Sequence, residues 1–172
     1  VLRYHMAPID CGILRGELMG ELIYRVASPF RVLPYNVTRR ILRADTLDEV
    51  SVFRAHNQVL DTGLQVILDR LRGVGPALTT FALGTGATAP GPDDTGPEGE
   101  VWRSDLSLLT RTGPILEAQY YLASNMCNGQ SLQSAMILAE DIPFSWVSFP
   151  AEEKTADFVW IFQWSFPIEA VV

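Results

Sequence analysis

The pattern of apolar and polar positions is most regular near the C-terminal end of the chain. Aromatic residues there occupy every second position, namely Phe158, Trp160, Phe162, Trp164 and Phe166. Successive side chains of a β-strand point to opposite faces, so this alternation predicts a strand with five rings on one face. Such a face must be covered by a second sheet, a helix or another subunit, and we expect it to serve as scaffold.

A different periodicity predicts one amphipathic helix near residues 62–72. Its apolar residues are spaced at i, i+3, i+4 and i+7, namely Leu64, Ile67, Leu68 and Leu71. Thr62 and Gln65 have the spacing of an N-terminal capping box. Gly73 is a suitable C-terminal stop.

The remaining apolar segments predict further short strands. They are residues 50–56 and 79–83, then 115–123, 131–139 and 144–149 before the aromatic strand. Asn128-Gly129 is a strong hairpin signal between two of them. Short links between successive strands favour antiparallel pairing. We therefore expect a mainly β domain over residues 51–172, an antiparallel β-sandwich or a curled sheet, carrying the one helix.

Residues 1–50 look irregular and predict an extended N-terminal arm or edge segment. Residues 30–43 alternate loosely and contain four Arg and no acidic residue. This segment can extend onto a neighbouring copy or form an edge hairpin on its own domain. If it extends, the candidate assembly contacts are Phe30, Arg31, Arg39, Arg40 and Arg43, with Trp160 and Trp164 of the aromatic strand.

Composition supports assembly more than catalysis or nucleic-acid binding. The chain is 48% hydrophobic and 19% charged, which favours a large core or buried subunit contacts. Its net charge of −7 is uneven: residues 1–60 have eight Arg against six acidic residues, and residues 61–172 have five basic against fourteen. An acidic body argues against nucleic acid as the main ligand. No apolar run is long enough for a membrane helix, and two isolated cysteines suit a reducing compartment.

Candidate chemistry in the sequence is sparse. The glycine-rich loop at residues 84–99 has neither the lysine nor the spacing of a phosphate-binding loop. The acidic residues of this loop and the one that follows it are candidates for a hard cation such as calcium, although their spacing is not that of an EF-hand: Asp93, Asp94, Glu98 and Glu100. His5 and His56 stand alone, and no nucleophile motif is present. We expect no catalytic residues, no metal and no cofactor.

Two separated stretches together resemble small structural proteins of tailed bacteriophages. The first contains Leu83-Gly-Thr-Gly-Ala-Thr-Ala-Pro90, then Asp94-Thr95 and Glu100-Val-Trp-Arg103. The second contains Phe149-Pro-Ala-Glu-Glu-Lys-Thr155 before the final strand, with Lys154 the only lysine of the chain. The resemblance covers roughly residues 55–168. The chain departs from the pattern at 134–138, where relatives often have a glycine-containing strand.

This resemblance implies a non-enzymatic virion component, assembled in the bacterial host cytoplasm. We expect the tail, the baseplate or a fibre attachment, with copies of itself and other virion proteins as partners. A capsid decoration (cement) protein is the alternative of the same class. A carbohydrate-binding module is the alternative of another class, and it requires exposed rings beside polar groups, such as Trp102 and Tyr120-Tyr121.

Overall fold

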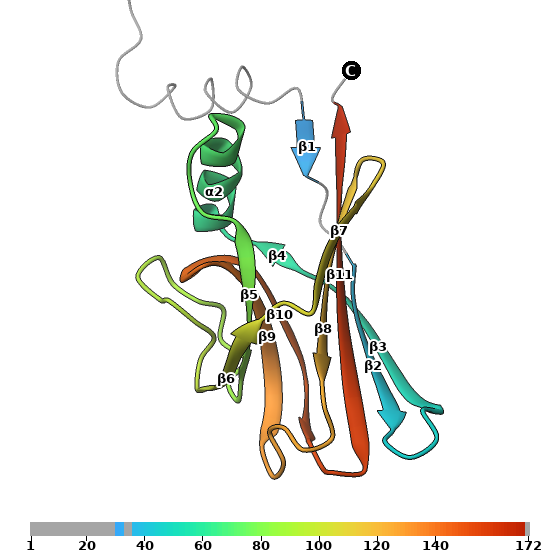
Figure 1. Ribbon diagram of the computed structural model, residues 1–172. Coiled ribbons are helices and arrows are strands. Elements are labelled where there is room, and N and C mark those ends of the chain that lie inside the picture. Colours follow the sequence, from blue (N-terminus) through green and yellow to red (C-terminus); the bar gives the residue numbers. More distant parts are fainter. Residues whose placement is uncertain (1–29, 33–35, 171–172) are drawn as a thin grey trace, which may run out of the picture. The chain divides into compact units, whose positions relative to one another are not determined.

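The computed structural model describes residues 30–32 and 36–170, and the side chains within 37–167. Two antiparallel sheets pack face to face as a β-sandwich (Figure 1). The first sheet has the order β3-β2-β11-β8-β7 and the second the order β4-β10-β9-β5-β6. The predicted fold class, a mainly β sandwich with one helix, is confirmed for these residues.

The first sheet contains β2 (Asn36–Arg43), β3 (Glu49–His56), β7 (Leu108–Thr112), β8 (Ile115–Leu122) and β11 (Phe158–Ala170). The second contains β4 (Gln58–Val59), β5 (Leu78–Gly84), β6 (Glu100–Asp105), β9 (Ser131–Ala139) and β10 (Ile142–Glu153). The helix is α2 (Asp61–Leu71), and a three-residue strand, β1 (Phe30–Val32), precedes β2.

The aromatic strand faces the core between the two sheets. Trp160, Phe162, Trp164 and Phe166 are each at most 3% exposed. Phe162 packs 5.2 Å, centroid to centroid, from Phe81 of the opposite sheet. Trp160 and Trp164, two of the candidate assembly contacts, are therefore core residues of their own chain. The second sheet covers the ring face, so no neighbouring subunit is needed to bury it.

Residues 36–43 form an internal strand rather than an arm. Strand β2 lies between β3 and β11, with Trp160 opposite Ile41 and Trp164 opposite Val37. Val37 and Ile41 are buried because their side chains point inward in that register. Of the two interpretations of residues 30–43, the hairpin on its own domain therefore describes 36–43. The sandwich includes residues assigned to the arm, and residues 1–29 lie outside the described part.

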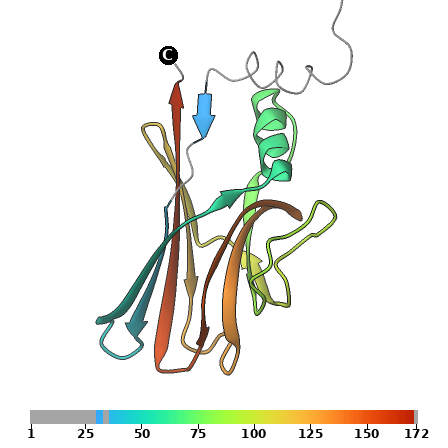
Figure 2. The ribbon, with the colours of Figure 1, turned by 180° about the vertical axis from the view of Figure 1, so that it is seen from behind.

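The chain crosses from one sheet to the other just before the helix (Figure 2). Strand β3 belongs to the first sheet and β4 to the second, and Asn57 stands between them. Asn57 is 4% exposed, and its Nδ2 donates to Ser145 Oγ at 2.5 Å. This buried polar contact holds the crossing segment against β10.

The helix forms where predicted, but its start and its buried face differ. Leu60 is the N-cap and makes no side-chain cap bond, so the predicted capping box is wrong. Thr62 Oγ1 instead donates to the carbonyl of Pro143 at 2.6 Å. Gly63 and Val66 are buried, whereas Leu71 is 71% exposed. Only a glycine at 63 allows this approach, because a Cβ there would clash with the Phe144 carbonyl.

Candidate functional site

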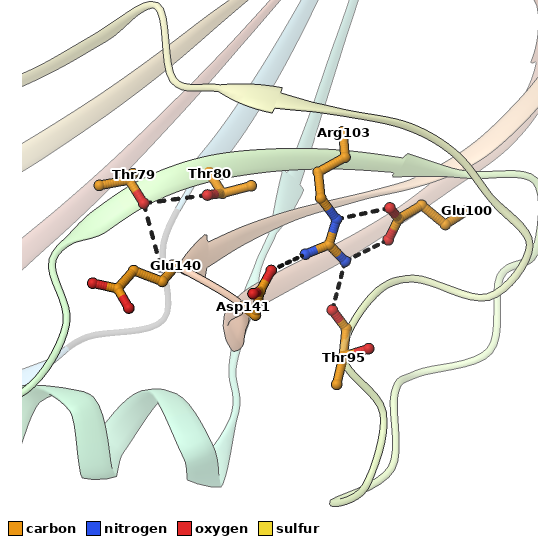
Figure 3. A network of polar contacts seen from close by, with 7 residues as sticks. All are labelled: Thr79, Thr80, Thr95, Glu100, Arg103, Glu140 and Asp141. Atoms are coloured by element: carbon orange, nitrogen blue, oxygen red, sulfur yellow. Dashed lines mark hydrogen bonds and ion pairs between the residues drawn. The ribbon is translucent and has the colours of Figure 1, made fainter.

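The side chain of Arg103 joins two loops along β6, the edge strand of the second sheet (Figure 3). Its Nε and Nη2 donate to the two oxygens of Glu100 at 2.8 and 2.7 Å. Nη1 donates to Asp141 in the turn between β9 and β10 at 2.9 Å, and Nη2 also donates to the Thr95 carbonyl at 2.7 Å. This fork of donors, which we call the Arg103 clasp, fixes the long loop against the sheet.

The long loop at residues 85–99 holds one shape through its own hydrogen bonds. At its base, Thr85 N donates to the Gly99 carbonyl at 3.1 Å and Gly86 N to the Glu98 carbonyl at 3.0 Å. Further out, Thr88 N donates to Glu98 Oε2 at 3.0 Å, and hydrogen bonding to Thr88, from its side chain first and from this backbone N–H second, lowers the pKa of Glu98. Residues 87–89 and 91–95 are exposed. The loop is therefore a preorganised projection.

The four acidic residues of the loop and the start of β6, at positions 93, 94, 98 and 100, do not converge on a cation site. Glu100 binds Arg103, Glu98 accepts from Thr88, and Asp94 Oδ2 accepts from Gly91 N at 2.7 Å. Within the described residues, no group of three or more His, Cys, Asp or Glu side chains could hold a metal. The calcium interpretation is wrong for this part of the chain, because Glu100, Glu98 and Asp94 each bind a different partner and no cluster of ligands forms.

Lys154 is a fully buried cation, which its place in a turn did not predict. It is 0% exposed, and its Nζ donates to the carbonyls of Ser124 and Thr155 at 3.2 and 2.8 Å. It also donates to Asn128 Oδ1 at 3.3 Å. Burial lowers the pKa of Lys154, and burial likewise raises the pKa of the free thiol of Cys127. Lys154 thereby ties the turn after β8 to the turn before β11.

Arg39 is buried between the sheets, although the sequence suggested a surface role. Its guanidinium lies 4.7 Å from the ring centroids of both Phe149 and Trp160, and 5.6 Å from that of Phe53. Its Nη2 pairs with Glu152 on β10 at 2.5 Å. Desolvation lowers the pKa of Arg39, and the Glu152 carboxylate opposes that effect. The sequence does contain a signal for this burial: Arg39 lies on the inward face of β2, between two apolar residues of the same face.

The other candidate assembly contacts have different positions. Arg40 and Arg43 are exposed, and Arg40 Nε lies 3.8 Å from a Glu49 oxygen. Phe30 and Arg31 belong to β1, and their side chains lie outside those described. Among the described side chains, Arg40 and Arg43 are thus the candidates that remain at the surface.

An apolar groove, which sequence reasoning missed, lies beside the helix. It has a volume of about 310 Å³ and is lined by residues that include Val66, Ile67, Arg70, Leu78, Leu109 and Leu116. Two lining residues are well exposed, Leu71 at 71% and Leu109 at 41%. Exposed apolar residues around a concave surface mark binding sites. The predicted helix pattern had assigned Leu71 to the core, so the sequence pattern did not indicate an exposed apolar surface here.

Most of the rings proposed for sugar stacking already make contacts within their own chain. Trp102 is half-buried, and its Nε1 donates to Tyr120 Oη at 2.7 Å. Tyr120 is 3% exposed and stacks on Phe81 at 4.1 Å. Tyr121 is exposed by 44%. These positions give no row of exposed rings of the kind that a stacking platform requires.

Comparisons with known proteins give no family for this chain. It matches no protein-family model, no curated protein and no solved structure. In the part of the chain that the structure describes, no helix is long and apolar enough to cross a membrane. The functional argument therefore depends on the residues and their contacts.

Proposed function

We propose that this chain is a non-enzymatic structural component of a tailed-bacteriophage virion, in the tail, the baseplate or a fibre attachment. It acts by assembling with copies of itself and with other virion proteins. The observation that carries the proposal is the resemblance at residues 83–103 and 149–155, combined with what these residues do in the fold.

The residues of that pattern have scaffolding contacts. Arg103 clasps the long loop, and Lys154 ties two turns together through three acceptors. Gly84 packs so closely on Pro97 and Ser134 that a side chain there would displace its neighbours. A fixed loop on a rigid sandwich suits a protein that presents the same contact many times in a symmetric particle.

The surface also supports assembly. Large apolar side chains remain exposed in the described residues, including Leu71 at 71%, Val74 at 52% and Leu108 at 49%. Two of the exposed apolar side chains, Leu71 and Leu109, line the groove beside α2. Apolar surface of this kind is typical of protein contact sites.

The test is to purify particles of a phage that encodes this chain and to quantify the chain in separated tails and capsids. We expect many copies per particle, in the tail fraction. Copies confined to the capsid fraction would instead identify a decoration protein. A chain abundant in the lysate and absent from purified particles would refute the proposal.

A further inference from the structure

The groove beside α2 combines an apolar floor with one cation, Arg70, for which the described side chains supply no carboxylate partner. Arg70 lines the groove, and its Nη1 donates to the Gly75 carbonyl at 3.0 Å. Arg72 is paired with Asp69 at 3.3 Å, whereas no ion pair of Arg70 is found among the described residues. An occupant with apolar side chains and a negative charge would therefore complement this surface.

The loop segment at residues 87–95 has this chemistry. Its exposed residues include small apolar side chains and two acids, namely Ala87, Ala89, Pro92, Asp93 and Asp94. The hydrogen bonds of Glu98 and the Arg103 clasp already fix its shape. A preorganised segment loses little conformational entropy on docking. The entropy cost therefore offsets less of the favourable free energy of the contact.

The loop and the groove are separate surfaces of one chain. No residue of 85–99 lines the groove, and the clasp holds Thr95 against β6. Leu78 in the groove and Gly84 at the base of the loop stand at opposite ends of β5. A contact between two different surfaces of identical subunits is head-to-tail, and it closes into a ring or extends as a filament.

We propose that residues 87–95 of one copy dock into the groove of a second copy, with Asp93 facing Arg70. The inference rests on the proposed assembling function and names the contact that performs it. Because every copy has one loop and one groove, each subunit binds two neighbours. This arrangement suits a ring or tube of a tail.

A photo-crosslinking amino acid at position 71 tests this contact directly. Leu71 is 71% exposed at the groove, so the substitution leaves the core intact. In an equal mixture of isotope-labelled and unlabelled full-length chains, we expect products that join position 71 to the 87–95 segment of the other copy. Arg70→Glu and Asp93→Lys should each reduce this yield about tenfold, and the two in combination should recover it.

Arg54→Glu is the charge-matched control, because Arg54 is exposed on β3 away from the groove, and its yield should match the unsubstituted chain. Products that join position 71 to residues 1–29 or to any other segment would overturn the inference. A multimer in light scattering without the loop product would refute this contact and leave the assembling function standing. A monomer without products would refute both this contact and the self-assembly that the proposed function includes.

Discussion

Replacing Lys154 by Met removes the buried cation while keeping the length of the side chain. The carbonyls of Ser124 and Thr155 and the Asn128 amide oxygen then lose their donor. An acceptor that is left without a partner away from water costs about 1–3 kcal/mol, which applies to the two carbonyls, whereas the exposed Asn128 can accept from water. Because Met is uncharged, the variant does not have to desolvate a cation on folding, and this gain offsets part of that cost. We expect Lys154→Met to lower the free energy of unfolding by about 2–4 kcal/mol.

Urea unfolding followed by tryptophan fluorescence measures this change, since Trp160 and Trp164 are buried. With a slope of about 2 kcal/mol per M, the midpoint should fall by about 1–2 M. Arg54→Met is the control, because Arg54 is an exposed cation, and its free energy of unfolding should stay within about 0.5 kcal/mol of the parent's. If Lys154→Met unfolds together with this control, the argument that Lys154 ties the turns together is wrong.

The same variant gives a pH dependence of known sign. Burial lowers the pKa of Lys154, so at alkaline pH the unfolded chain binds the proton more tightly than the folded chain. The stability that Lys154 confers therefore rises with pH from its folded pKa up to about 10.4. The difference between parent and Lys154→Met should widen over that window. A difference that narrows would contradict the assignment.

Three further changes test other contacts. Gly63→Ala should cost about 1–3 kcal/mol in urea unfolding, because its Cβ would clash with the Phe144 carbonyl; a stabilised variant would refute that packing. Glu152→Gln should cost about 1–2 kcal/mol and more than Arg39→Met, because it leaves a buried guanidinium uncompensated, and the reverse order would contradict this reasoning. Burial raises the pKa of Cys127, so iodoacetamide should modify it more slowly in the folded chain than in urea at about pH 8, as peptide mapping would show. Equal modification rates in the folded chain and in urea would contradict that expectation.

The sandwich was predictable in large part because the aromatic residues of β11 follow strict alternation. The rings of β11 and the hairpin signal at Asn128-Gly129 specify strand, face and turn with local information alone. The helix was predictable in position from its periodicity, but not in orientation. Its rotation depends on Gly63 meeting a carbonyl of β10, and that is a contact between distant parts of the sequence.

The contacts of the candidate site were harder to predict for the same reason. Arg39 looked like a surface residue because its neighbours include other arginines, and its carboxylate partner lies on a distant strand. Lys154 looked solvated because it lies in a turn, and its acceptors come largely from another turn. The groove depends on which face of α2 is buried. Polar partners supplied by another element leave no periodic signal in the sequence.

The mass of the full-length protein in solution, measured by light scattering after size exclusion across a concentration series, most directly tests the central claim of a self-assembling structural component. The account predicts a defined multimer, whose subunit number would state how many copies the head-to-tail contact joins. A monomer at every concentration would contradict it.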